Sequence, residues 1–261
     1  MRAIWKGAVS FGLVSIPVRL HAATEDRDVS FHQVHAADGG RVRYRRVCST
    51  CGEEVPYADL AKGYELATGE MIVLTEEDLA ALPLPTTKTV ELLAFVPAEQ
   101  LDPLGYARGY HLEPESSGRK PYLLLRRALQ ESGRVGLVKV AIRSKEALAV
   151  LRPRGQGLVL QTMVWPDEVR PGAADGLDGD VTVSDAEVGV ATTLIDAMAA
   201  DYEPERYTDA YREAVRSMID AKVAGDVIVP AAREEERTEV VDLVSALQAS
   251  VTAARAARSA S

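Results

Sequence analysis

The chain has 261 residues and a formal net charge of −9, with 39 acidic and 30 basic residues. This length is enough for one large domain or for a core with appendages, and the composition is that of a soluble folded protein. Two cysteines are too few for a disulfide framework, which fits a reducing cytoplasm. The acidic total argues at first against nucleic-acid binding, but the charge is uneven. Residues 119–170 contain 11 basic and 4 acidic residues, whereas residues 171–261 contain 8 basic and 18 acidic residues.

The N-terminal apolar run, Ala8–Val18, follows two basic residues and so has some features of a signal peptide. Pro17 within the run and Arg19 directly after it argue against that interpretation. Apolar and polar residues alternate over 9–16, which predicts the start of the fold as one or two strands over Ile4–Leu20. No other apolar run approaches membrane-spanning length, so no membrane partner is expected.

The most basic stretch of the chain is RVRYRRVCSTCG, residues 41–52. We expect a strand here, paired with a strand over 29–35 through a turn at Asp38-Gly39-Gly40. Alternation would place Arg41, Arg43 and Arg45 on one face and Arg46 on the other. Such a strand could lie against a polyanion, or it could be a charged edge strand that resists aggregation. The stretch alone leaves both interpretations open.

Cys48 and Cys51 have the spacing of a zinc knuckle, but two thiolates make only half of a zinc site. His32 and His35 are close in sequence, yet a spacing of three along a strand directs them to opposite faces. Two knuckles in a symmetric dimer could complete a four-cysteine site. We favour a turn without metal, and no cofactor is expected.

The remainder of the N-terminal region predicts mixed α and β structure. The expected strands cover residues 71–74, 89–96, 110–112, 135–143, 147–152 and 158–165, and the last three form an antiparallel meander. Thr75 precedes three acidic residues and predicts a helix start. A second helix is expected over Tyr122–Glu131, with Pro121 at its start and Gly133 after its end.

Beyond a Gly/Asp-rich linker at 171–179, the spacing of apolar residues changes from every second residue, as in a strand, to the period of about 3.6 residues of a helix. Ser184 and Glu187 form a capping box, followed by an apolar stripe of Val188, Ala191, Ile195 and Met198. Further helices are expected at 207–224 and 238–257, separated by a polar linker at 226–237. The apolar stripe of the last helix either binds a partner or packs on its own domain.

No catalytic motif is present, so the sequence indicates a binding protein and not an enzyme. Basic residues are not interleaved with aromatic ones, and no helix has a basic N-terminal face, so base stacking and groove-reading helices are not expected. What remains is phosphate contact from strands and loops, which is independent of sequence and salt-dependent. The expected DNA-binding residues are Arg41, Arg43, Arg45, Arg46, Lys62, Arg119, Lys120, Lys139, Arg143, Arg152 and Arg154.

Several blocks of the sequence together resemble the bacterial Ku family of DNA-end-binding proteins. They are Arg2–Gly7, Ser10–Val14, Ile16–Val18, Thr24–Asp28, Arg45–Cys48, Cys51–Pro56, Lys62–Glu65, Leu151–Arg154 and Val240–Leu243. The resemblance covers most of the chain. It implies an α+β fold with a β-barrel core over 1–170 that includes an extended bridging arm at about 40–75. A helical arm at 180–225 and a linker with a C-terminal ligase-docking segment at 226–261 would follow.

The resemblance also implies function: a homodimeric ring that threads onto double-stranded DNA ends in non-homologous end joining. Such a ring would recruit and stimulate the ATP-dependent multifunctional DNA ligase of bacterial end joining, in the cytoplasm and associated with the nucleoid. The implied ligase-binding residues are Val240, Val241, Leu243, Val244 and Leu247. The alternative is a zinc-ribbon-like protein-interaction adaptor without end-specific DNA binding.

The sequence departs from the family pattern in three ways. It starts at the core motif, it has two cysteines where a full zinc ribbon needs four, and it has no lysine-rich extension after Ala257. Metal in the bridge and the bridging of separate DNA molecules are therefore not expected.

Overall fold

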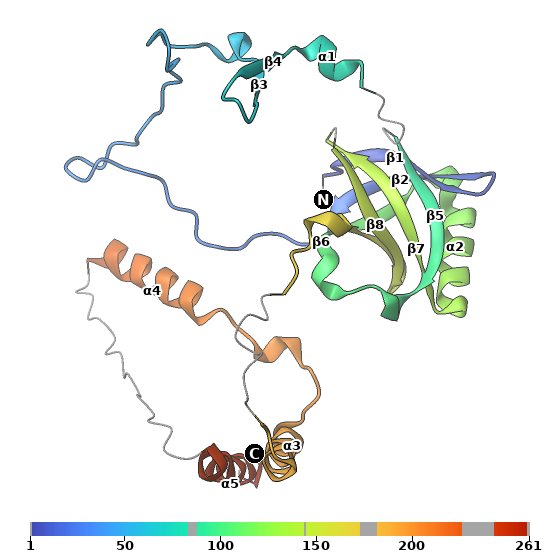
Figure 1. Ribbon diagram of the computed structural model, residues 1–261, viewed down its shortest axis with the longest axis vertical. Helices are drawn as coiled ribbons and strands as arrows, with labels where there is room; N and C mark the ends of the chain where they lie inside the picture. Colours follow the sequence, from blue (N-terminus) through green and yellow to red (C-terminus); the bar gives the residue numbers. More distant parts are fainter. Residues whose placement is uncertain (1, 83–87, 144, 173–181, 226–242, 260–261) are drawn as a thin grey trace. The chain divides into compact units, whose positions relative to one another are not determined.

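A computed structural model of the chain describes residues 2–82, 88–143, 145–172, 182–225 and 243–259 (Figure 1). The chain divides into two compact units. One comprises residues 1–27 and 32–171, and the other comprises residues 28–31 and 172–261.

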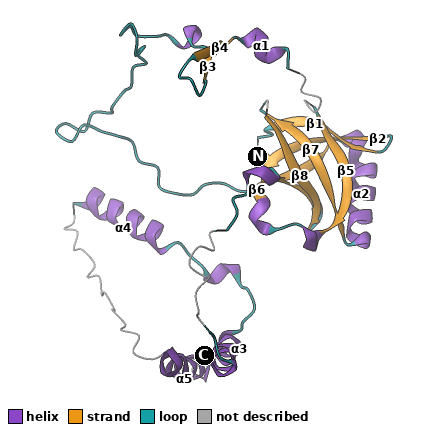
Figure 2. Cartoon of the chain, in the orientation of Figure 1, coloured by secondary structure: helices purple, strands orange, loops and turns teal. Residues whose placement is uncertain are grey.

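The first unit contains a closed barrel of seven strands in the order β1-β2-β6-β9-β8-β7-β5 (Figure 2). The strands are β1 (Trp5–Phe11), β2 (Val14–Ala22), β5 (Thr89–Pro97), β6 (Tyr106–Pro114), β7 (Arg134–Ile142), β8 (Lys145–Arg154) and β9 (Gly157–Met163). Six neighbouring pairs are antiparallel, and the barrel closes through a short parallel pairing of β1 with β5. The expected α+β class with a β-barrel core is confirmed.

Alternation along each strand separates the barrel interior from its outer wall. In β2, Ile16, Val18 and Leu20 are completely buried, whereas Arg19 between them is exposed. In β7, Val138 and Val140 belong to the same buried cluster. The apolar interior is therefore a packed core, which β-branched residues and leucines fill as expected for a small barrel.

Helix α2 (Arg119–Ser132) packs against β2, β7 and β8 and buries Tyr122, Leu125 and Leu129. It ends at Gly133, whose φ of 64° is the left-handed conformation that favours glycine at a helix C-terminus. The helix expected between Pro121 and Gly133 is confirmed, although it begins two residues before Pro121. The antiparallel meander is also confirmed, as β7, β8 and β9.

The N-terminal apolar run, where one or two strands were expected over Ile4–Leu20, forms two strands. It forms the hairpin of β1 and β2, in which Phe11 pairs with Val14 and the tip is Gly12-Leu13. Gly12 has a φ of 59°, so the tight turn uses the one residue of the run that adopts this conformation without a steric penalty.

The arm segment between β2 and β5 contains little regular structure. A two-stranded sheet pairs β3 (Lys62–Glu65) with β4 (Met71–Leu74), and α1 (Glu76–Ala80) follows a capping box between Thr75 and Asp78. The strands expected at 29–35 and 41–47 do not form. Two isolated bridges, Val34 with Arg41 and Val47 with Glu54, take their place. A strand is stabilised by a ladder and by a buried face, and this stretch has neither, since Val34, Val42 and Val47 are exposed.

Among its described residues, the second unit contains three α-helices: α3 (Asp185–Met198), α4 (Ala210–Ala224) and α5 (Leu243–Ser259). The expected capping box of Ser184 and Glu187 begins α3. Helix α4 starts three residues later than expected, because Asp209 caps it. Residues 238–242, where the last helix was expected to start, and both linkers at 173–179 and 226–237 lie outside the described residues.

Candidate nucleic-acid interface

The basic residues of the arm are exposed, and two of them have local side-chain contacts. Arg45 forms an ion pair with Glu54, with Nη1 and Oε2 3.3 Å apart, and the guanidinium of Arg46 lies 5.5 Å from the ring centre of Tyr57. Arg41 and Arg43 are exposed on either side of the exposed Val42. The shared face expected for Arg41, Arg43 and Arg45 depended on a regular strand, so that expectation is wrong. The cluster is a charged loop and not a flat basic strand.

The two cysteines lie in a tight turn in which the N–H of Gly52 donates to the carbonyl of Cys48 at 2.9 Å. Hydrogen bonds from the backbone of Cys51, and to a smaller extent of Thr50, lower the pKa of the Cys48 thiol to about 7. This turn therefore favours a thiolate, which is the form that binds metals. Within the described part of the chain, no group of three or more His, Cys, Asp and Glu side chains gathers around it.

On the barrel, Lys139 and Arg152 occupy the outer wall formed by β7, β8 and β9. Lys139 Nζ lies 3.5 Å from Glu146 Oε2 and 5.8 Å from the ring centre of Trp165. Arg152 Nη2 donates to Gln161 Oε1 at 3.2 Å. Both side chains are partly buried. Glu146 partly neutralises Lys139, and Gln161 orients Arg152, so this wall is only moderately basic.

The other expected barrel residues lie at opposite ends of that wall. Arg143 follows β7 directly before β8, and Arg154 ends β8, so about 30 Å of strand separates them. Arg119, at the start of α2, shares a small concavity with Gln156 and Gly157 next to Arg154. Lys120 is its exposed neighbour. The structure thus distributes the expected residues over two ends and one wall of the barrel.

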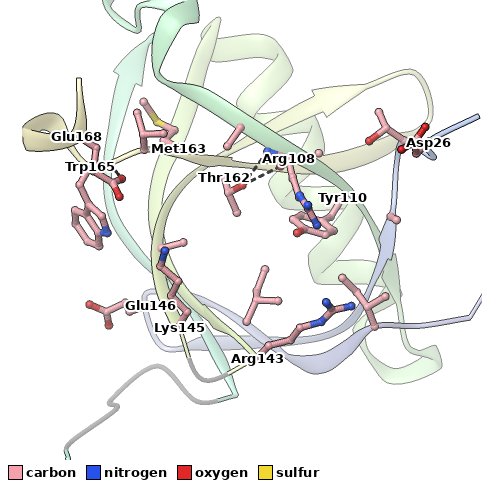
Figure 3. A pocket seen from close by; sticks show the side chains of 18 of the residues that line it. Asp26, Arg108, Tyr110, Arg143, Lys145, Glu146, Thr162, Met163, Trp165 and Glu168 are labelled. Carbon is pink, nitrogen blue, oxygen red and sulfur yellow. Dashed lines mark hydrogen bonds between the residues drawn. The ribbon is translucent and has the colours of Figure 1, made fainter. Parts of the chain in front are cut away.

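Sequence reasoning identified Arg143 at the open end of the barrel but missed two basic residues there, Arg108 and Lys145. There, Arg108, Arg143 and Lys145 line a cavity of about 860 Å³ (Figure 3). Tyr110 and Thr162 also line it. Arg108 is isolated in the sequence, and only the curvature of the barrel brings it near the β7–β8 turn, so no sequence signal could have identified this group. We refer to this cavity and its lining as the barrel mouth.

Four carboxylates also border the barrel mouth, and three of them have identified partners. Glu25 pairs with Arg27 at 2.7 Å, Glu146 with Lys139 at 3.5 Å, and Glu168 accepts from the backbone N–H of Trp165 at 2.7 Å. Asp26, the fourth, is also engaged in an interaction. By contrast, among the residues that the structure describes, the side chains of Arg108, Arg143 and Lys145 form no ion pair.

The expected ligase-docking stripe is only partly described, because Val240 and Val241 and the side chain of Leu243 lie outside the described residues. Val244 and Leu247 are half-buried on α5, and Val251, one turn further along the same face, is buried. Helix α5 packs against α3. Of the two open alternatives for this stripe, the described part shows packing on its own domain, against α3, and partner binding stays a prediction.

The half-buried face of α3 differs from the apolar stripe that the sequence predicted. The half-buried apolar residues of α3 are Val190, Ala191, Leu194 and Ala197. Val188, Ile195 and Met198 are 51%, 67% and 67% exposed, so three of the four residues assigned to the apolar stripe point away from the packed face. The helix is apolar on more than one side, and periodicity alone could not identify the face that packs.

In the segments that the structure describes, no helix combines the length and the apolar character needed to cross a lipid bilayer.

Comparison with known proteins shows the family to which the barrel is similar. The family model of the Ku70/Ku80 beta-barrel domain matches residues 10–190.

Three relatives match nearly the whole chain. The non-homologous end joining protein Ku of Frankia casuarinae is 57% identical over 258 residues, covering 99% of this chain and 65% of that protein. The non-homologous end joining protein Ku 2 of Saccharopolyspora erythraea is 48% identical over 263 residues, covering 99% and 86%. The non-homologous end joining protein Ku of Mycobacterium tuberculosis is 43% identical over 267 residues, covering 99% and 98%. The chain thus spans 65% of the length of the Frankia protein and nearly all of the M. tuberculosis protein.

Proposed function

The chain belongs to the Ku family of non-homologous end joining proteins, and we propose that it binds double-stranded DNA ends, independently of sequence, as a homodimeric ring. The observation that carries the proposal is the 43% identity to the M. tuberculosis end-joining protein over 98% of that protein's length. Membership in this family also places the chain among non-catalytic DNA-repair proteins.

Phosphate contact is the mode of DNA binding that the geometry supports best. The exposed Arg41, Arg43, Arg45 and Arg46 lie on an irregular loop, and Lys139 and Arg152 lie on a barrel wall. None of these elements is a helix that could enter the major groove, and the arginines of a loop can follow a phosphate backbone without reading bases. Arg119, Lys120, Arg143 and Arg154 extend the proposed contact surface toward the two ends of the barrel.

The proposed dimer interface lies on the arm, where several apolar side chains are exposed to solvent. Tyr64, Met71 and Val73 of the β3–β4 sheet are 63%, 55% and 61% exposed. A two-stranded sheet is marginally stable by itself in water, and exposed apolar residues on both strands favour a protein partner. A second copy of the chain would supply the same sheet and the same apolar surface, as a symmetric interface requires.

The proposed ligase contact is the α5 stripe of Val244 and Leu247, together with Val240, Val241 and Leu243. It is apolar and follows a highly acidic segment, as is common for helices that dock into a partner's groove. We propose that this stripe recruits and stimulates the ATP-dependent repair ligase of bacterial end joining.

DNA topology provides the decisive test of the ring. A closed ring binds linear duplex but cannot load onto a covalently closed circle of the same sequence, because the circle has no end to thread. We expect gel-shift binding to the linear duplex only, and we expect cutting the circle once to restore binding. Equal affinity for the linear and circular forms would exclude a threaded ring.

A further inference from the structure

We propose that the barrel mouth is a phosphate-binding site, separate from the arm, that takes a terminal phosphate or pyrophosphate group. The proposal does not depend on end binding. It rests on three cationic side chains around one cavity, on the backbone irregularities that position two of them, and on the ion pairs that Glu25 and Glu146 form with other cations.

Arg108 is positioned by an irregularity in the pairing of β6 with β9. Between the pairs Tyr106–Met163 and Gly109–Gln161 the register shifts by one residue. The backbone of Arg108 is fixed there by Thr162, whose hydroxyl accepts from the Arg108 N–H at 3.0 Å and donates to the Arg108 carbonyl at 3.1 Å. Bulges of this kind redirect a side chain out of the regular alternation. Arg108 consequently extends into the barrel mouth (Figure 3).

Arg143 is positioned by an unfavourable backbone conformation. Its φ of 53° is the only positive value among non-glycine residues in the described part of the chain. A β-carbon destabilises this conformation, and strained residues of this kind are concentrated at ligand-binding sites. Every other described residue with a positive φ is a glycine, including Gly133 and Gly155 at other turns of the barrel.

The cations of the mouth are available to an anion. Arg108, Arg143 and Lys145 have no ion-pair partner among the described residues, whereas Glu25 and Glu146 form ion pairs with Arg27 and Lys139. Glu168 accepts from a neutral backbone N–H and keeps its charge, and Asp26 has an interaction of its own. Cations in a cleft with low-dielectric walls produce a focused positive potential, which raises the local concentration of anions. Two arginines and a lysine, from β6, the β7–β8 turn and the start of β8, provide several donors around one cavity, which suits a phosphate bearing two or more negative charges.

The cavity has room for a ligand of this class. Its volume of about 860 Å³ exceeds what a single phosphate needs, and Tyr110 contributes an aromatic wall. The phosphate could come from two sources: the phosphorylated 5′ end of a DNA strand, or a free small molecule such as pyrophosphate or a nucleotide. The chemistry at the site is the same for both.

Calorimetric titration of the full chain with inorganic pyrophosphate tests the site. We expect saturable binding that weakens by about tenfold or more in an Arg108→Gln, Lys145→Gln double variant, because two charge-assisted contacts are lost. Neither residue belongs to the proposed DNA-contact set. Arg127→Gln is the matched control: Arg127 is an exposed cation of α2, paired with Glu131 at 2.6 Å, and should leave pyrophosphate binding unchanged.

Arg143→Gly separates a binding role from a structural one. Glycine accepts a positive φ without strain, so the variant should melt no lower than the wild type while binding pyrophosphate about tenfold more weakly. Wild-type pyrophosphate affinity in this variant, or an equal loss in Arg127→Gln, would overturn the proposal.

The source of the phosphate is resolved by comparing duplexes with 5′-phosphate and 5′-hydroxyl ends. A wild-type preference for the 5′-phosphate that disappears in the Arg108→Gln, Lys145→Gln variant identifies the DNA strand end as the ligand. Equal binding of both duplexes, together with saturable pyrophosphate binding, identifies a free phosphorylated molecule. Absence of both the preference and the pyrophosphate binding would refute the site.

Discussion

The hydroxyl group of Tyr122 accepts a hydrogen bond from the backbone N–H of Leu158 at 2.6 Å, in the buried contact between α2 and the barrel. The same hydroxyl donates to the carbonyl of Leu112 at 2.8 Å. One side chain of α2 thus satisfies backbone groups of β6 and β9. Burial raises the pKa of this hydroxyl above its ordinary value, so it stays protonated and able to donate.

Tyr122→Phe should lower the free energy of unfolding of the barrel by about 1–3 kcal/mol, because it leaves the N–H of Leu158 and the carbonyl of Leu112 buried without a partner. Urea unfolding followed by far-UV circular dichroism measures the change. Tyr57→Phe is the control, since Tyr57 is 78% exposed and its ring remains available to Arg46. Equal stability of Tyr122→Phe and the wild type would show that water satisfies both backbone groups.

Arg43→Glu combined with Arg45→Glu should weaken binding to all duplex ends alike and reduce the steepness of the salt dependence. Each lost phosphate contact removes about 0.9 from the slope of log affinity against log salt. Fluorescence anisotropy at several salt concentrations, with ends of different sequence, gives both quantities. Arg127→Glu changes the same type of charge on α2, outside the proposed contact set. A loss confined to one end sequence would contradict phosphate readout.

Val73→Asp should convert the dimer to a monomer and abolish end binding, because a charge would replace an apolar side chain in the proposed interface between two arms. Sedimentation analysis measures the mass, and the thermal melt of the barrel should stay unchanged since Val73 is 61% exposed. Glu70→Gln, in the turn between β3 and β4, is a conservative control that should remain dimeric. A dimeric Val73→Asp protein would place the interface elsewhere.

Leu194→Asp on α3 should expose the α5 stripe and increase its affinity for the ligase by several fold, because α3 and the ligase compete for the same apolar face. The prediction follows from the half-burial of Leu194, Val244 and Leu247 in the packing of α3 with α5. Ile195→Asp is the matched control, one residue away and 67% exposed. Affinity measured by surface plasmon resonance distinguishes the outcomes. Reduced affinity in Leu194→Asp would mean that the ligase recognises the helix pair as a unit.

Sequence patterns predicted those strands and helix ends that depend on residues close together in the chain. The alternation over 9–16 falls in β1 and the start of β2, Gly133 ends α2, and Ser184 caps α3. The Ku resemblance added the barrel and the family, which the comparisons confirm. The sites of DNA, dimer and ligase contact remain predictions that the experiments above can decide.

Local rules failed where stability depends on distant partners. The alternation of Arg41, Arg43 and Arg45 resembles a strand, yet no ladder or buried face supports one, and only isolated bridges form. Periodicity on α3 likewise selected Val188 and Ile195, although α5 covers the side that carries Leu194.

The sequence by itself determined which residues could form a core, where helices start and end, and that phosphate contact is the available chemistry. These properties depend on side chains within a few positions of one another. Only the tertiary structure decided that β1 closes on β5, that the basic residues divide between two ends of the barrel, and that Arg108 joins Arg143 and Lys145 at one mouth. Those relations depend on strand order and register, which bring together residues far apart in the chain and which no local pattern encodes.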